Sequence, residues 1–136
     1  MPRLATDRGL ELNPILCLKK PSCRRALLAS AKSYPSVADG NGGNIEKGSI
    51  TYDICQKNLE EIILVEEDDI KLAARVFLEN ERALIEPTTA VGLAGYMKVH
   101  KQFKGKNIVI VTCGRNVTMP TLNKILEDTK HMKMKK

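Results

Sequence analysis

Short apolar runs alternate with helix-like stripes along most of the chain. Two runs, Glu61–Glu66 and Ile108–Thr112, consist almost entirely of apolar and β-branched residues. Runs of this length and composition predict strands that are buried on both faces. A third run, Ile15–Leu18, is consistent with one more short strand near the start of the chain.

Helical periodicity occupies the stretches between these runs. The clearest helix starts at three acids, Glu67–Asp69, which favour the positive end of a helix dipole. Its core-facing stripe falls at i, i+3, i+4, i+7 and i+8. Pro87 suits the first turn of the following helix. The pattern as a whole predicts helices over residues 23–32, 50–59, 67–82, 87–103 and 120–129.

The order of these elements predicts the fold class. From residue 61 onward it reads strand, helix, helix, strand, helix, which predicts an α/β fold with a partial parallel sheet and flanking helices. The chain of 136 residues has the size of one domain. Residues 1–35 are poorly placed by the pattern, residues 36–130 form the predicted domain, and residues 131–136 form a basic tail.

Composition and charge exclude several classes of protein. The chain has no run of about 20 apolar residues, so the sequence predicts no membrane span. Four cysteines without a C-x-x-C pair, and only two histidines, favour neither a zinc site nor a disulfide framework, and we expect a cytoplasmic protein. The net charge is +6, but we interpret the basic tail as a solvated terminus and do not expect nucleic-acid binding.

The first candidate site lies where the predicted strand 108–112 runs into a turn. Cys113 would project from the strand end, Gly114 would let a ligand approach the backbone, and Asn116 can both donate and accept hydrogen bonds. The carboxyl end of a strand in an open α/β sheet is the usual ligand-binding position. The alternative is that Cys113 is a structural cysteine beside a turn.

The second candidate is Glu86, which precedes Pro87 at a predicted helix start. It is either a helix cap or a carboxylate directed at a ligand. The small residues that follow, including Gly92 and Gly95, suggest close approach by another backbone or a ligand. By contrast, the acids at residues 66–69 cannot all converge on one ion, so we interpret them as helix-start residues rather than a metal site.

Four segments, taken together in their order and spacing, resemble a known family. They are Val37–Gly40 (VADG), Glu60–Ile70, Leu84–Thr88 (LIEPT) and Ile108–Asn116. Over residues 36–128 the chain resembles the C-terminal part of the threonine dehydratases and serine racemases, which are fold type II pyridoxal-phosphate enzymes. The resemblance implies the C-terminal part of the large domain of such an enzyme.

The resemblance also implies roles for single residues. Cys113 would contact the pyridine nitrogen of pyridoxal 5'-phosphate, with Gly114 and Asn116 beside it and Glu86 at the edge of the active site. Arg115 stands where the family usually has a second glycine. Two weaker matches implied by the family are Arg82 as a nucleotide-effector contact and Glu11 as a divalent-cation ligand, and the metal itself stays undetermined.

The family's lysine that binds the cofactor covalently lies in a Ser-x-Lys-x-Arg-Gly segment, and this sequence contains none. We therefore expect part of a pyridoxal-phosphate dependent serine or threonine ammonia-lyase (dehydratase), or of a serine racemase-like protein, that is inactive alone. Its implied partners are a small hydroxy-amino acid and a second copy in a homodimer. The alternative is a non-catalytic binding or dimerisation module derived from the same fold.

Overall fold

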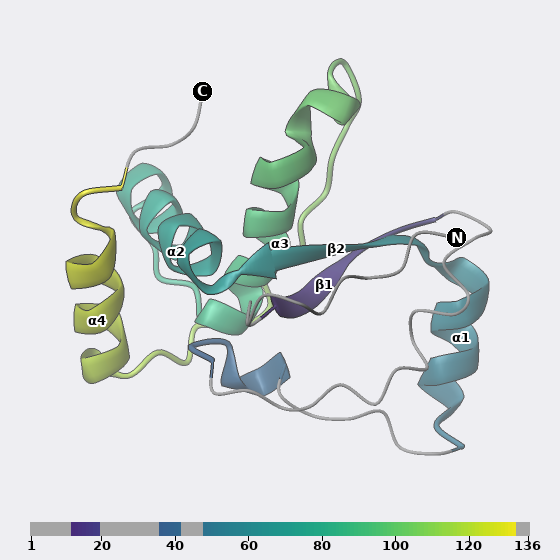
Figure 1. Ribbon diagram of the computed structural model, residues 1–136, viewed down its shortest axis with the longest axis horizontal. Helices are drawn as coiled ribbons and strands as arrows, with labels where there is room; N and C mark the ends of the chain where they lie inside the picture. Colours follow the sequence, from purple (N-terminus) through teal and green to yellow (C-terminus); the bar gives the residue numbers. More distant parts are fainter. Residues whose placement is uncertain (1–11, 20–35, 42–47, 133–136) are drawn as a thin grey trace, which may run out of the picture.

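The computed structural model describes residues 12–19, 36–41 and 48–132 (Figure 1). The predicted helix at residues 23–32, Glu11 and most of the basic tail lie outside these residues. The elements are β1 (Leu12–Lys19), η2 (Asp39–Asn41), α1 (Ile50–Asn58), β2 (Glu60–Glu66), α2 (Glu67–Glu81), α3 (Pro87–Val99), η3 (His100–Phe103) and α4 (Met119–Thr129). No helix in the described part of the chain is long and apolar enough to cross a membrane.

The sheet differs from the one that the sequence predicts. β1 and β2 pair antiparallel, with Leu12 opposite Glu66 and Lys19 opposite Glu60, and the register shifts between Pro14 and Cys17. The prediction of strands near residues 15–18 and 61–66 is confirmed, but the predicted parallel pairing is wrong for the described residues. A strand is defined by its hydrogen-bonded neighbour, and β2 finds that neighbour in β1.

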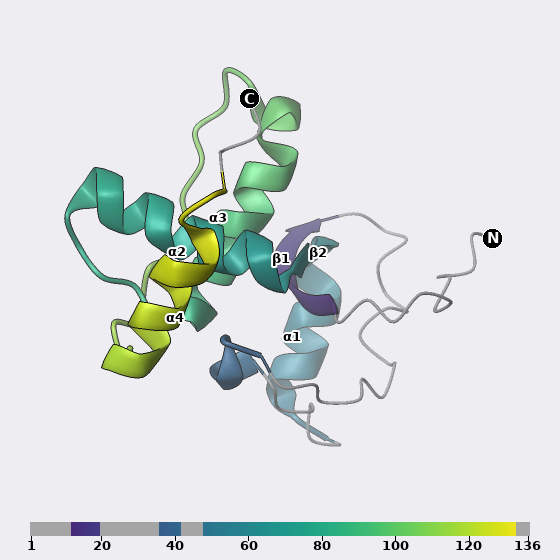
Figure 2. The ribbon, with the colours of Figure 1, turned by 60° about the vertical axis from the view of Figure 1, so that its left-hand side comes forward.

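The predicted strand at residues 108–112 is also wrong for the described part of the chain. These residues belong to a connection between η3 and α4 that contains no helix or strand. Both ribbon views show the connection running back alongside α3 (Figures 1 and 2). Cys113 therefore follows an unpaired segment rather than the end of a sheet strand.

The core lies where β2, α2, α3 and α4 meet. β2 contributes alternate residues, Ile63 and Val65, because successive side chains of a strand point to opposite faces. α2 contributes the predicted stripe, of which Ile70, Ala73 and Ala74 are buried and Phe77 packs against them. The remaining buried apolar residues are Ala38, Ile85, Ala90, Val91, Ala94 and Ile125.

The helix boundaries follow the signals in the sequence. α2 begins at Glu67, with three acids in its first turn, and α3 begins at Pro87. α2 ends at Glu81 and is capped by Arg82, a left-handed residue (φ 54°) whose N–H donates to the carbonyl of Leu78. α4 begins one residue earlier than predicted, at Met119, after the Thr118 side chain caps it by accepting a hydrogen bond from the N–H of Thr121.

Two basic side chains of α2, one helical turn apart, hold the C-terminal end of α4 against that helix. Lys71 Nζ lies 2.7 Å from Asp128 Oδ2, and an Arg75 guanidinium nitrogen donates to the Thr129 carbonyl at 2.6 Å. Burial alone would lower the pKa of Lys71, but the hydrogen bond to Asp128 and the charges of Asp128 and Asp68 raise it overall. The same hydrogen bond lowers the pKa of Asp128. Lys71 and Asp128 are therefore both charged around neutral pH.

These shifts predict how stability depends on pH. A carboxyl group whose pKa is lowered by folding stabilises the fold above its unfolded pKa, about 3.9, and that contribution is lost as the pH falls through the folded pKa. We expect Asp128→Asn to lower the free energy of unfolding at pH 7 and to have a smaller effect at pH 3. Urea unfolding at the two pH values measures the difference.

Glu127→Gln is the matched control, because the Glu127 side chain has no ion-pair partner within the described ranges. It should change stability little at either pH. An Asp128→Asn effect of the same size at pH 3 and pH 7 would contradict the assigned ion pair.

Candidate functional site

The candidate site forms where the turn at residues 113–116 meets the first turn of α3. The N–H of Glu86 donates to the Gly114 carbonyl at 3.1 Å, and the N–H of Gly114 donates to Thr89 Oγ1 at 3.2 Å. The N–H of Asn116 donates to Glu86 Oε2 at 3.2 Å. These hydrogen bonds bring Glu86 together with Gly114 and Asn116, two other candidate residues from the sequence. Gly114 and Asn116 follow Glu86 by 28 and 30 positions in the chain.

Gly114 is required by this close approach. A Cβ built on residue 114 would lie 2.1 Å from the Glu86 carboxyl carbon and 2.2 Å from one of its oxygens. The backbone φ of Gly114 is not positive, so any residue could adopt its conformation. The Glu86 carboxylate excludes a side chain at residue 114, because it occupies the space that a Cβ would need.

Glu86 occupies the N-cap position of α3 without acting as a side-chain cap. Its backbone is extended (φ −70°, ψ 153°), and its side chain makes no capping hydrogen bond to the helix. The carboxylate instead reaches across to the main chain of Asn116. A role for Glu86 toward a ligand stays a prediction, but the simple capping alternative does not describe its side chain.

Cys113 stands beside this arrangement as an exposed, free thiol. Arg115, which follows Gly114, is also exposed, and its carbonyl accepts a hydrogen bond from the N–H of Val117. No cluster of three or more metal-ligating side chains occurs among the residues that the structure describes. The acids at residues 66–69 include Glu67, whose carboxylate accepts hydrogen bonds from the Ser36 hydroxyl and the Val37 N–H, at 2.9 and 2.6 Å.

A polar hollow of about 260 Å³ opens beside Glu86 and Asn116. Its walls come from three places in the sequence: residues 37–40, the start of α3, and residues 116–121, where the connection leads into α4. It is lined by Val37, Asp39, Gly40, Glu86, Pro87, Thr88, Asn116, Val117, Thr118 and Thr121. Gly40 is pressed so closely against α3 that a Cβ there would lie 2.8 Å from Thr88 Oγ1. The hollow thus joins the VADG and LIEPT segments to Asn116.

Only some of the predicted site residues lie at this hollow. Glu86 and Asn116 line it, Gly114 lies against Glu86, and Cys113 is not part of its wall. Sequence reasoning missed Thr88, Thr118 and Thr121, which line the hollow, and Thr89, whose Oγ1 accepts the hydrogen bond from the Gly114 N–H. Their only signal was a threonine near a helix start, and of the four only Thr118 is an N-cap.

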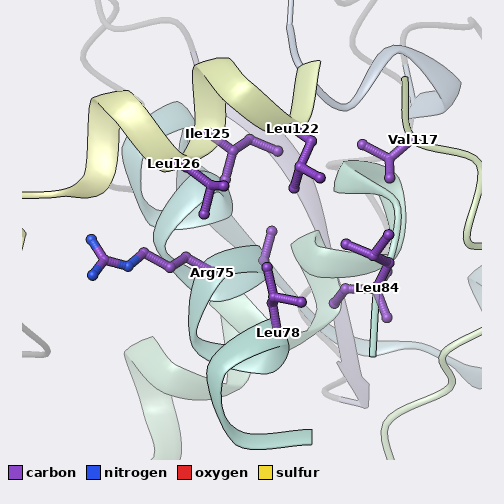
Figure 3. Close-up of a pocket in the computed structure, with 9 residues that line it drawn as sticks. Arg75, Leu78, Leu84, Val117, Leu122, Ile125 and Leu126 are labelled. Carbon is purple, nitrogen blue, oxygen red and sulfur yellow. The ribbon is translucent and has the colours of Figure 1, made fainter. Parts of the chain in front are cut away.

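A second, apolar crevice separates α2 from α4 (Figure 3). Arg75 lies at its edge, and Leu78, Leu84, Val117, Leu122, Ile125 and Leu126 line it together with Ala74 and Ile85. Its volume of about 10 Å³ is no more than a single water needs, and an apolar void of that size stays dry. The crevice is a packing defect of the core, and it shares Val117 with the polar hollow.

Comparison with known proteins gives consistent matches. Residues 18–114 match the model of a family described as pyridoxal-phosphate dependent enzymes. The chain is 38% identical over 82 residues to the biosynthetic L-threonine dehydratase of Haemophilus influenzae, covering 59% of this chain and 16% of that protein. It is 36% identical over 95 residues to the serine racemase of Dictyostelium discoideum, covering 67% and 28% respectively.

Solved structures agree with the sequence matches. The crystal structure of serine racemase from Dictyostelium discoideum superposes with a TM-score of 0.59 at 30% identity, over 76% of this chain and 34% of that chain. Threonine deaminase isoform 2 from Solanum lycopersicum gives a TM-score of 0.56 at 29% identity, over 68% and 27%. The chain spans about a sixth to a third of the length of the proteins it matches.

The contact between Gly114 and Glu86 predicts a specific mutational effect. Because the carboxylate is the mobile end of a side chain, Gly114→Ala should push it off Asn116 rather than move the backbone. We expect a loss of about 1–3 kcal/mol in the free energy of unfolding. Faster hydrogen exchange of the Asn116 amide would show which contact is lost.

A double-mutant cycle with Glu86→Ala tests the assignment, because both changes remove the same contact and their effects should be far from additive. Gly92→Ala is the matched control. A Cβ there meets only the Ile110 side chain, at 3.6 Å, so this change should stabilise α3 by up to about 1 kcal/mol. Additive effects of Gly114→Ala and Glu86→Ala would contradict the proposed contact.

Proposed function

Because the chain belongs to the family of pyridoxal-phosphate dependent enzymes, we propose that it supplies part of the active site of a serine or threonine ammonia-lyase or of a serine racemase-like protein. The expected resemblance to threonine dehydratases and serine racemases is confirmed by relatives that carry those names. Since the chain spans at most a third of these relatives, the reaction and its hydroxy-amino acid substrate belong to the proposal.

The residues of the site fit one part of the cofactor, its pyridine ring. The observation that carries this is the turn itself: an exposed thiol at Cys113 precedes a glycine held against α3 by hydrogen bonds on both sides. Because the Glu86 carboxylate covers one side of Gly114, the ring would lie on the exposed side of the turn, beside the Cys113 thiol. When bound, pyridoxal phosphate supplies an electron-withdrawing ring that acidifies the Cα–H of an amino acid.

In this proposal each residue has a limited role. The Cys113 thiol contacts the pyridine nitrogen and, being a weak neutral partner, does not favour protonation of that nitrogen as an aspartate would. This suits elimination better than transamination. Glu86 is a positioning residue, because its carboxylate fixes the main chain of Asn116 and so sets the shape of the turn.

Asn116 contributes an amide side chain at the wall of the hollow, where it can donate and accept hydrogen bonds. The hydroxyl groups of Thr88, Thr118 and Thr121 give the same wall further donors and acceptors. This composition suits a small polar group better than an apolar one, which supports a hydroxy-amino acid as the substrate class.

The chain does not contain the lysine segment by which the family holds its cofactor covalently. We expect the purified 136-residue chain to bind pyridoxal phosphate weakly and to release no 2-oxo acid from L-serine or L-threonine. Cofactor titration by absorbance measures the first expectation, and a coupled 2-oxo acid assay measures the second.

Variants of Cys113 test its proposed contact with the pyridine nitrogen of the cofactor. Cys113→Ser keeps a neutral hydrogen-bonding group and should leave cofactor affinity within about twofold, whereas Cys113→Ala should weaken it by roughly 2–10-fold, the worth of one hydrogen bond. Cys55→Ala, which removes a free cysteine in α1, is the control and should have no effect. Turnover by the chain alone, or equal affinity of wild type and Cys113→Ala, would overturn this assignment.

A further inference from the structure

One wall of the polar hollow comes from a short stretch that lies far from the rest of the site in the sequence. This stretch, residues 36–41, contains η2 and is called the wall segment below. It supplies Val37, Asp39 and Gly40 to the lining of the hollow. It packs against the start of α3, next to which it lies in Figure 1. The shape of the hollow therefore depends on where the wall segment is held.

The wall segment is seated against α3 with little room for movement. A Cβ on Gly40 would lie 2.8 Å from Thr88 Oγ1, so the main chain at residue 40 packs directly against α3. The Ala38 side chain is fully buried in the core. The Asn41 N–H donates to the Ala38 carbonyl at 3.0 Å and closes the turn between these two residues. Because packed interiors leave few voids, a displacement of this segment would change both its contact with α3 and the width of the hollow.

One carboxylate, that of Glu67 at the start of α2, holds the beginning of the wall segment. Its Oε1 accepts the Val37 N–H at 2.6 Å, and its Oε2 accepts the Ser36 hydroxyl at 2.9 Å. The Ser36 hydroxyl oxygen in turn accepts the Ala38 N–H at 2.9 Å. Hydrogen bonds to an ionised acceptor are stronger than those between neutral groups. Glu67 therefore attaches the wall segment firmly to α2, across about 30 positions of the sequence.

Compensation of the helix dipole alone does not explain this geometry. Asp68 and Asp69 lie in the same first turn of α2 and already favour its positive end. The Glu67 carboxylate is directed at the wall segment instead. Glu67 is also absent from the lining of the hollow, so a ligand in the hollow would not touch it. Any effect of Glu67 on such a ligand must therefore pass through the segment that it holds.

We infer that Glu67 is a positioning residue for the hollow: by holding Ser36 and Val37, it keeps the wall segment at the distance from α3 that a ligand needs. The inference rests on the proposed function, because a hydroxy-amino acid is the ligand class proposed for the hollow. Glu67 acts through geometry, since both of its contacts are hydrogen bonds to groups of the wall segment. A side chain of the same shape with hydrogen-bonding atoms in the same places should therefore replace it, whereas a truncated side chain should not.

The first readout is taken on the whole chain without a ligand. Glu67→Ala removes both acceptors, so amide exchange at Val37 should become about tenfold faster. Glu67→Gln keeps an oxygen for the Val37 N–H and offers an N–H to the Ser36 hydroxyl oxygen, so exchange should stay within about threefold of the wild type. The Leu122 amide, which donates to the Thr118 carbonyl at the start of α4, reports on the rest of the fold and should exchange at an unchanged rate.

The second readout is ligand binding, with L-serine as the probe. Shifts of the Thr88 and Asn116 amide signals during a titration give its dissociation constant. Because a wall that must be ordered on binding costs affinity, Glu67→Ala should raise this constant about fivefold, whereas Glu67→Gln should leave it within about twofold. Glu66→Ala removes the same charge at the neighbouring, exposed position. This matched control should change neither readout.

The possible results separate the inference from the proposed function. Unchanged exchange at Val37 in Glu67→Ala would show that the carboxylate does not hold the wall segment. Faster exchange with an unchanged dissociation constant would show that the wall segment does not control the hollow, and equal losses in Glu67→Ala and Glu67→Gln would assign the effect to charge. Each of these results overturns the inference. If the wild-type chain binds no L-serine, the substrate class of the proposed function fails, and the exchange measurement alone decides whether Glu67 positions the wall.

Discussion

The candidate site depends on the hydrogen bonds that hold one irregular connection against the start of α3. The connection between η3 and α4 has neither a helix nor a strand to fix its path. Its hydrogen bonds to Glu86 and Thr89 fix the turn at Gly114 and Asn116. Because the N–H groups at the start of a helix have no partner within the helix, this region is well suited to organise a neighbouring chain. The hollow exists because the turn is held there.

A second set of contacts holds α4 against α2 and thereby positions the wall of the hollow that α4 contributes. Lys71 and Arg75 reach from α2 to the last turn of α4, where the unpaired carbonyl groups carry partial negative charge. The Thr129 hydroxyl donates to the Ile125 carbonyl at 2.6 Å and closes the same turn from within. α2 therefore positions both ends of the site, since its first residue, Glu67, also holds Ser36 and Val37.

The sequence predicted what depends on local periodicity and missed what depends on distant partners. The stripe that begins at Ile70 and the helix start at Pro87 are local signals, and both are confirmed. The run at residues 108–112 satisfies every local rule for a strand, but pairing requires a neighbour, and the described chain offers none. Within the site, Glu86, Gly114 and Asn116 were predicted because they belong to recognisable motifs. Thr89 was not, because a buried threonine in a helix has no distinctive spacing.

One side chain, Val117, borders two spaces of opposite character: the apolar crevice under α4 and the polar hollow beside Glu86. A larger apolar residue there would fill the crevice and narrow the hollow, while a smaller one would widen the hollow and loosen the packing of α4. The packing of α4 and the width of the hollow are therefore coupled at a single position. Residue 117 is consequently a place where engineering one property of this protein trades directly against the other.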